Sequence, residues 1–307
     1  MDVAPLSPED VDAVVTRIAR RLRDDARRNH LVAPALDRAT TTDALRAAAS
    51  SVWVARRGGV VVGHLYGAVL GDGADRAAWV GPDGSSCDDS ETLASLYAVA
   101  GREWINAGAT RHVAWALDGA AHHAPWLELG FARSSVRASR RLTGQRARPL
   151  PVGYRWRHGG IDHLDAAVML GREIDRVQAL GPSFLLDAGE ESLRTNLADT
   201  LDDPETIHHL VEYGGDVVAQ AIIFPLDPRR GSFDDSWHLS TVAVAREHQH
   251  RGIATALVDH ALADARARGG QIMETSWRVT NRDAQRFWLH YGFRPTYVRL
   301  QRRVGSD

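Results

Sequence analysis

Gln249, Gly252 and Ala254 stand in the spacing Q-x-x-G-x-A, where a β-branched segment gives way to a helical pattern. The first turn of a helix offers unpaired backbone N–H groups and the positive end of the helix dipole, which together favour an anion. Gly252 would let a phosphate approach the backbone, and Arg251 could add a charge-assisted contact. The segment therefore predicts a diphosphate-binding helix start, with an ordinary helix start as the alternative interpretation.

The elements around this segment follow from the pattern of apolar residues. A β-branched run predicts a strand over 238–244, and apolar residues at helical spacing predict a helix over 254–270 that ends at a Gly-Gly pair. Two apolar runs at 206–213 and 217–224 flank a second Gly-Gly pair and predict a β-hairpin. The diphosphate segment therefore joins a strand to a helix.

This pattern occurs twice in the chain. A displacement of 162 positions carries WLELGF at 126–131 onto WLHYGF at 288–293, and it also carries the run 136–141 onto 298–303. The Gly-Gly hairpin segment at 56–64 has its counterpart at 212–220. Repetition on this scale indicates two copies of one domain.

A segment rich in Pro, Gly and Arg at 143–153 has no apolar periodicity and is typical of a linker. We therefore predict a domain over 1–145 and a second over 153–307. Each copy predicts an α+β fold in which helices flank a central, mostly antiparallel sheet.

A second motif follows the diphosphate segment, in NRDAQRFWLHYGF, and its members are Asn281, Ala284, Phe287, Gly292 and Phe293. In this order, separated by one helix and one strand, the two motifs resemble those of the GNAT acetyltransferase superfamily over about residues 205–304. The resemblance implies two tandem GNAT-like domains, an arrangement similar to that of mycothiol synthase. It also implies that acetyl-CoA lies between two neighbouring strands that splay apart.

The resemblance implies which residues bind acetyl-CoA, the expected cosubstrate. Backbone groups of Val242 and Val244 and the side chain of Asn281 would bind the pantetheine arm. The Val244 N–H would also donate to the thioester oxygen as that oxygen becomes an oxyanion. The residues that would hold the diphosphate are Gln249, His250, Arg251, Gly252, Ile253 and Ala254.

The N-terminal copy lacks the diphosphate segment. By the same displacement, 249–252 corresponds to the sequence Cys-Asp-Asp-Ser at 87–90, which places carboxylates where a phosphate would lie. Asp88 and Glu91 fit a capping box for a helix over 91–104, so the protein's own side chains would satisfy this helix start. We therefore expect one CoA per chain, bound by the C-terminal copy.

His238 is the candidate general base. In the histone-acetylating branch of the GNAT superfamily, a glutamate base lies fourteen residues before the first motif glycine, which is the position of His238 here. An imidazole with an ordinary pKa of about 6.5 could accept a proton from an ammonium substrate near neutral pH. A histidine packed on a strand face is the alternative.

The general acid of the family is a tyrosine five residues before the Phe of Gly-Phe, and Trp288 occupies that position here. An indole N–H is a donor but not a practical acid. Tyr291, one turn further along, is the candidate substitute, with simple packing as the alternative. Because the leaving thiolate has a pKa of about 8.5, it needs less help from an acid than an alkoxide would.

Composition excludes several classes of protein. Lysine is absent: Lys plus Arg number 37, all of them Arg, against 39 Asp plus Glu, for a net charge of −2. The chain therefore cannot use a Schiff-base lysine, a pyridoxal phosphate anchor or a P-loop lysine. The small negative charge argues against a nucleic-acid or anionic-membrane partner.

Other absences narrow the class further. Cys87 is the single cysteine, so no intramolecular disulfide can form. The N-terminal segment lacks an apolar targeting region, and no run approaches the roughly 18 apolar residues of a membrane span. These features predict a cytoplasmic protein. No set of His, Cys, Asp and Glu has metal-ligand spacing along the chain, so we expect no metal.

The sequence thus predicts an N-acetyltransferase whose C-terminal domain moves an acetyl group from acetyl-CoA directly to an amine of a small molecule. Asp234, Asp235 and Glu212 would favour a cationic amine on the acceptor side, with a solvated loop as the alternative. Two other functions stay open. One is a non-catalytic acyl-CoA-binding or interaction module, which Trp288 favours, and the other is a protein or peptide N-acetyltransferase.

Overall fold

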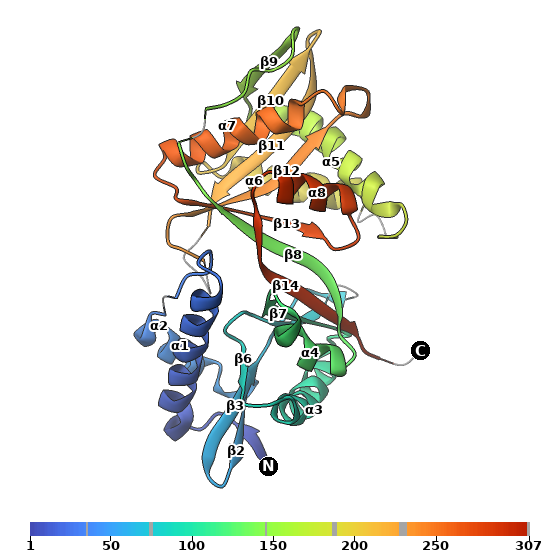
Figure 1. Cartoon of the computed structure of the whole chain (residues 1–307). Helices are drawn as coiled ribbons and strands as arrows, with labels where there is room; N and C mark the ends of the chain where they lie inside the picture. The colour runs from blue at the N-terminus through green and yellow to red at the C-terminus, as the bar shows by residue number, and fades with distance from the viewer. Residues whose placement is uncertain (35, 74–75, 145, 186–188, 227–231, 306–307) are drawn as a thin grey trace. The chain divides into compact units, whose positions relative to one another are not determined.

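The computed structural model describes residues 1–307 except 35, 74–75, 145, 186–188, 227–231 and 306–307. These residues form two compact units (Figure 1). Unit 1 consists mainly of Met1–Arg137 and Pro295–Asp307, and unit 2 mainly of Ala138–Pro228 and Asp234–Arg294. The last strand of the second sequence copy therefore belongs to unit 1, and the end of the last strand of the first copy belongs to unit 2. Gln145, where we expect the first domain to end, lies outside the described residues.

Unit 1 contains a four-stranded sheet in the order β1-β2-β3-β6 and a second set of strands in the order β4-β5-β7-β14-β8. Its strands are β1 (Asp2–Pro5), β2 (Val52–Arg57), β3 (Val60–Tyr66), β4 (Ala68–Leu70), β5 (Ala77–Val80), β6 (Ser85–Cys87), β7 (Arg111–Leu117), β8 (Ala132–Arg141) and β14 (Arg294–Arg303). Its α-helices are α1 (Val11–Arg28), α2 (Arg38–Ala47), α3 (Ser90–Asn106) and α4 (Ala120–Glu128).

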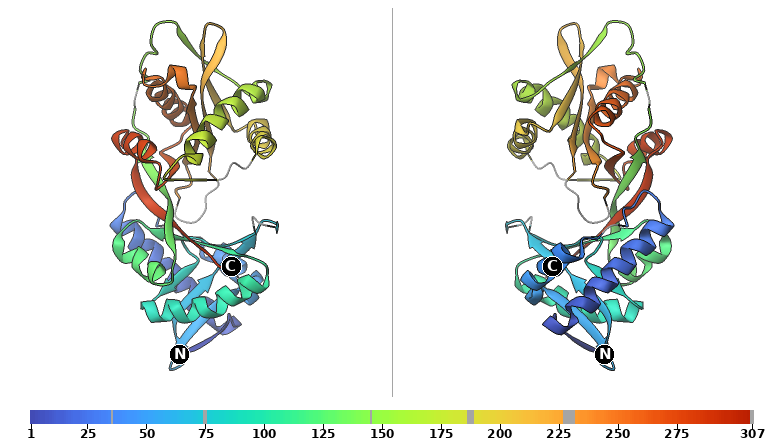
Figure 2. Two further views of the ribbon diagram at one scale, coloured as in Figure 1. Left: turned by 90° about the vertical axis from the view of Figure 1, so that its right-hand side faces the viewer. Right: turned by 90° about the vertical axis from the view of Figure 1, so that its left-hand side faces the viewer.

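Unit 2 contains strands in the order β8-β13-β12-β11-β10-β9, where β8 contributes its end. The other strands are β9 (Tyr154–His158), β10 (Ile207–Tyr213), β11 (Asp216–Pro225), β12 (Ser236–Val244) and β13 (Ile272–Arg278). The α-helices are α5 (Leu164–Ala179), α6 (Glu190–Asp202), α7 (Ile253–Ala267) and α8 (Arg282–His290). Helix α7 covers one face of the sheet, and α5 with α6 covers the other (Figure 2).

The predicted elements of the C-terminal copy are confirmed, with ends that move by one to three residues. The hairpin forms between β10 and β11, and Gly214 and Gly215 in its turn have φ of 63° and 99°, which favours glycine. Helix α7 buries its apolar side, from Ile253 to Ala265, against the sheet. It ends three residues before the predicted end because Gly269, at φ 91°, turns the chain away.

The internal repeat is confirmed in three dimensions. The two Gly-Gly hairpins share a β-bulge, which falls between Ala55 and Arg56 in β2 and between Val211 and Glu212 in β10. Helices α4 and α8 and strands β8 and β14 keep the displacement of 162 positions at both ends. The fold is therefore a mixed α/β arrangement in which two copies of one pattern contribute to two units.

Strands β8 and β14 are neighbours in unit 1, and their side chains bond reciprocally. Ser134 Oγ donates to the Arg299 carbonyl (3.0 Å), and Thr296 Oγ1 donates to the Arg137 carbonyl (3.1 Å). These four residues are two pairs related by the repeat. Corresponding residues of the two copies thus make reciprocal bonds between these two strands.

A buried aromatic pair forms the same contact in each copy. Trp126 packs edge-on against Phe131 with ring centroids 4.9 Å apart, and Trp288 packs the same way against Phe293 at 5.2 Å. Both tryptophans are less than one-tenth exposed. This repeated packing explains why Trp occupies the position at which the GNAT motif has tyrosine.

Among the described residues, no helix has the length and apolar character needed to cross a membrane.

The core of unit 1 holds a histidine that should make its stability sensitive to acid. His64 is fully buried, and burial lowers its pKa from 6.5 to about 4, although the Asp83 carbonyl 3.1 Å from Nε2 opposes this shift. The unfolded chain therefore binds a proton near pH 6.5 that the folded chain does not, so stability falls as the pH drops from about 6.5 to about 4.

We expect His64→Gln, which installs the residue found at the matching position 220, to remove up to about 3 kcal/mol of this pH dependence. Urea unfolding at a series of pH values measures it, with the exposed His290→Gln as the control. An unchanged slope in the His64 variant would contradict the prediction.

Candidate functional site

Strands β12 and β13 pair over only part of their length. The parallel ladder joins Ser236–Leu239 to Ile272–Thr275, after which β12 continues to Val244 and β13 to Arg278. The β11–β12 register shifts at the same place, and Ser240 is the extra residue of this bulge. Because a bulge bends its strand, β12 turns away from β13 at this point. The two strands thus separate at the position where the sequence predicts a cofactor cleft.

The backbone of β12 presents donors on the side away from β11. Ala245 N bonds to the Val218 carbonyl (2.8 Å), and alternate residues of an antiparallel strand bond to the same neighbour. Ala243 and Thr241 therefore face β11, whereas the backbone groups of Val242 and Val244 point to the side where β13 has departed. The Val244 carbonyl accepts from Gln249 Nε2 of the following loop (2.9 Å).

Helix α7 begins without a side-chain cap. Its first internal bond runs from Ala256 N to the Gly252 carbonyl (3.1 Å), so three N–H groups, including those of Ile253 and Ala254, precede that bond. Gly252 is the N-cap residue, has φ 82°, and offers open space where a Cβ would lie. The first turn contains no acidic residue. This helix start is open to an anion.

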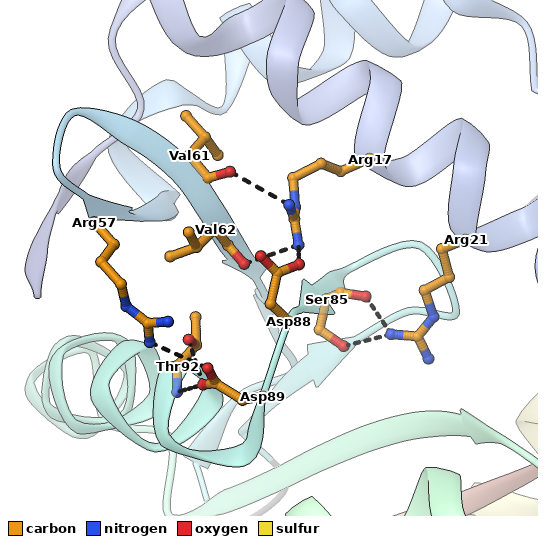
Figure 3. A network of polar contacts seen from close by, with 9 residues as sticks. All are labelled: Arg17, Arg21, Arg57, Val61, Val62, Ser85, Asp88, Asp89 and Thr92. Atoms are coloured by element: carbon orange, nitrogen blue, oxygen red, sulfur yellow. Dashed lines mark hydrogen bonds and ion pairs between the residues drawn. The ribbon is translucent and has the colours of Figure 1, made fainter.

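The matching helix start in unit 1 is closed by the protein's own carboxylate. Asp89 is the N-cap of α3 and accepts from Thr92 N (2.7 Å) and Thr92 Oγ1 (2.6 Å), as Figure 3 shows. These bonds, followed by that from Arg57, lower the pKa of Asp89 to about 2, so the carboxylate is charged at neutral pH. An anion is therefore already in place at this helix start.

The predicted capping box of Asp88 and Glu91 is wrong by one residue. Asp88 instead binds Arg17 of α1 at 2.6 Å (Figure 3). Two consecutive aspartates offer two capping registers, and Thr92, three residues after Asp89, selects the second because its hydroxyl adds a bond. The conclusion that the N-terminal helix start is satisfied by its own side chains holds.

A strand outside the motifs supports the diphosphate segment. The hydroxyl oxygen of Tyr154, on β9, lies 2.8 Å from His248 Nδ1 and accepts a hydrogen bond from Arg251 Nη1 (3.2 Å). Arg251 Nη2 also donates to the Glu247 carbonyl (3.0 Å), while His250 has φ 61° in the same loop. Arg251 is thus held beside the start of α7. Tyr154 was missed because it lies 97 positions before Arg251, just after the linker.

Asn281 is the N-cap of α8, and its Oδ1 accepts from Ala284 N (2.9 Å). This bond explains the Asn and Ala spacing in the second motif without any ligand. The amide Nδ2 is not used by this cap, so it can still donate to a ligand.

His238 lies one residue before the last β12–β13 pair. Its ring is 5.3 Å from that of Phe224 on β11, and it is in register with Glu274 on β13. Residues in register on adjacent strands project from the same face. Glu274 is only 3% exposed, although a carboxylate is rarely buried. The sequence did not predict this residue as part of the site, because a single Glu within a strand matches no motif.

Tyr291 lies in a buried polar cluster that braces α7. Its hydroxyl bonds to Asp259 Oδ1 and to the Thr255 carbonyl (3.2 Å), and burial followed by Asp259 raises its pKa above the ordinary value. Arg148 approaches the same Asp259 at 3.4 Å, and Arg140 donates to the Tyr291 carbonyl (2.5 Å). This arrangement favours the packing interpretation of Tyr291 over a role as general acid.

The three acidic residues expected on the acceptor side do not lie together. Asp234 and Asp235 line a pocket of about 300 Å³ beside the first residue of β12, with Glu205 and Arg268 also in its wall. Glu212 pairs in register with Val217, next to the far end of β12, and binds Arg157 at 2.5 Å. The grouping of Glu212 with Asp234 and Asp235 is therefore wrong.

Residues 176–293 match the model of the acetyltransferase (GNAT) family. The tRNA(Met) cytidine acetyltransferase TmcA of Aeropyrum pernix is 38% identical over 68 residues, which make up 22% of this chain and 9% of that protein. The match therefore covers less than a tenth of the length of this relative.

Solved structures share the fold of the whole chain. A GCN5-related N-acetyltransferase from Sphaerobacter thermophilus is similar at a TM-score of 0.66 and 17% identity, over 100% of this chain and 97% of that one. A tandem GNAT protein from the clavulanic acid biosynthesis pathway is similar at a TM-score of 0.58 and 19% identity, over 100% and 99%. At these identities the likeness establishes a tandem fold and no substrate.

Proposed function

Because the chain carries an acetyltransferase domain of the GNAT family, we propose that this domain transfers an acetyl group from acetyl-CoA to an amine of a small molecule. The observation that carries the proposal is the contrast between the two helix starts. In α7 the first N–H groups follow Gly252, an N-cap residue without a capping side chain, whereas in α3 the N-cap residue is Asp89. One copy is built to accept a diphosphate, and the other has filled that position itself.

The residues of unit 2 fit the parts of the cosubstrate. The α7 start, with Gly252, Ile253 and Ala254, would hold the diphosphate, and Arg251 would add positive charge to it. Gln249 would act mainly through its hydrogen bond to the Val244 carbonyl, which holds the loop before α7. His250 would act through its positive φ, which turns the backbone just before Gly252. Val242 and the Asn281 amide would bind the pantetheine arm, as the family resemblance implies.

The transfer itself needs a donor at the carbonyl and a base at the amine. The Val244 N–H points to the side where β12 and β13 separate, so it would stabilise the oxyanion that forms on the thioester carbonyl. His238 would take the proton from the attacking amine, and the in-register Glu274 would orient its ring. With Tyr291 bound to Asp259, the thiolate would leave without a dedicated acid.

A small amine is favoured over a macromolecule as the acceptor. The net charge of −2 gives no field for nucleic acid, although the TmcA relative is named for an RNA substrate. A protein or peptide amine is the alternative acceptor, and mass spectrometry of what the enzyme acetylates in a cell extract distinguishes the two. The single cysteine supports action in the cytoplasm.

The second candidate function is a non-catalytic acyl-CoA-binding module. It is favoured by Trp288, which removes the tyrosine acid of the family and is buried against Phe293. Thiol release from acetyl-CoA in the presence of an amine library separates the two functions, because a binding module gains thermal stability with acetyl-CoA but releases no thiol.

Calorimetric titration with CoA should give one equivalent per chain. Gly252→Asp, which copies the closed start of α3, should weaken CoA binding at least about tenfold because its carboxylate competes with and repels the diphosphate. Gly269→Asp is the matched control, since Gly269 also has positive φ and open space but lies at the other end of α7. Two equivalents, or unchanged affinity in the Gly252 variant, would refute this assignment.

Tyr154→Phe should weaken CoA binding about three- to tenfold, because it removes the hydroxyl that holds Arg251 and His248. Its affinity for acetylpantetheine, which lacks the diphosphate, should stay unchanged. The control is Tyr213→Phe, on the ring that packs 4.6 Å from Tyr154. Equal losses for both ligands would show that Tyr154 supports the fold and not the diphosphate.

His238→Gln should lower kcat about 100-fold or more and remove the fall in rate on the acid side of the pH profile, because the base is lost. Tyr291→Phe should keep the wild-type pH profile, even if the variant is less stable. Steady-state thiol release across pH 5–9 measures both. An unchanged kcat in the His238 variant at every pH would show that His238 is not the general base.

A further inference from the structure

We propose that His158, His209 and Asp264 form a binding site for a divalent metal ion of the zinc class. The site lies in unit 2 and is independent of the proposed acetyl transfer. His158 and His209 are register partners on β9 and β10, and Asp264 comes from the helix α7 packed against β10. Linear spacing gave no sign of it, because at least 51 positions separate any two of these residues.

The three side chains converge on one point. His158 Nε2 lies 2.8 Å from Asp264 Oδ2, and His209 Nε2 lies 3.9 Å from the same oxygen. All three ligand atoms lie within 4.8 Å of one another. Donors around a tetrahedral zinc ion with bonds of about 2.0–2.1 Å stand about 3.3 Å apart. Side-chain rotations that move each donor atom by less than about 1 Å would reach that geometry.

Burial makes His209 the central ligand. Its side chain is fully buried, and within the described part of the chain its Nε2 makes no hydrogen bond. A buried polar nitrogen without a partner is costly, and this one faces the carboxylate of Asp264. The side chains of His158 and Asp264 are 53% and 31% exposed, so an ion can enter and keep a water molecule as its fourth ligand.

Trp156 sets the state of His209 before an ion binds. Its indole Nε1–H donates to His209 Nδ1 (3.2 Å), and its ring stacks on His260 at 4.3 Å and 6°. Since Nδ1 accepts, the proton of the neutral imidazole is on Nε2. When an ion binds Nε2, that proton leaves, and the neutral ligand carries its proton on Nδ1 instead. The indole N–H then faces another donor, so Trp156 opposes metal binding.

The effect of Trp156 distinguishes this site from chance binding of zinc to surface histidines, which Trp156 would not affect. Zinc chloride should raise the Tm of the chelator-treated full chain, and calorimetry should show one site. Trp156→Phe keeps an aromatic ring but removes the opposing donor, so it should tighten zinc binding about two- to tenfold. His158→Ala and Asp264→Asn should weaken binding at least about tenfold, as losing a ligand must cost at least as much as losing a supporting residue.

The controls keep the test decisive. His290→Ala removes an exposed histidine elsewhere in unit 2 and should bind zinc like the wild type. The two altered ligands are partly exposed, so far-UV circular dichroism should show folded variants. Three results would each overturn the site: no zinc-dependent rise in Tm, equal zinc affinity in the ligand variants and the wild type, or unchanged or weaker affinity in Trp156→Phe.

Discussion

The short ladder between β12 and β13 is the constraint on which the candidate site depends. After Leu239 and Thr275 the two strands no longer pair, and the bulge at Ser240 turns β12 away. The backbone donors of Val242 and Val244, which continued pairing would use inside the sheet, then lie beyond the end of the β12–β13 ladder. The same departure brings the end of β12 to the loop that starts α7, so one distortion supplies both the amide donors and the helix start.

The two copies carry different N-cap residues at the start of the corresponding helix. Both carry a helix of similar length after the corresponding strands, and both keep the Trp and Phe packing that follows it. They differ in the residue before the helix. Gly252 leaves the first N–H groups of α7 without a cap, whereas Asp89 caps α3 with a carboxylate whose pKa is lowered to about 2. The charge on the N-cap residue is therefore one of the differences between the two helix starts.

Much of the fold of the C-terminal copy could be predicted from the sequence, because it depends on patterns of neighbouring residues. The α7 segment, the Gly-Gly hairpins and the repeat depend on periodicity and on glycines that adopt positive φ, and all are confirmed. The reciprocal strands were not predicted: β14 joins unit 1 and the end of β8 joins unit 2. Because both strands carry Val-Arg followed by Arg-Arg at the same spacing, this shared pattern gives no local signal for which partner each strand will choose.

The other site residues that the sequence did not predict are brought in by a segment distant along the chain. Tyr154, Trp156 and His158 are alternate residues of β9, which among the described strands pairs only with β10 and is an edge strand. Alternation places all three on one face of that strand, the face that meets α7. Tyr154 then contacts the loop before α7 and His158 meets Asp264 three turns along the helix. The five residues of β9 thus make contacts from the N-terminal end of α7 to Asp264. An edge strand with one neighbour needs such contacts to stay in register.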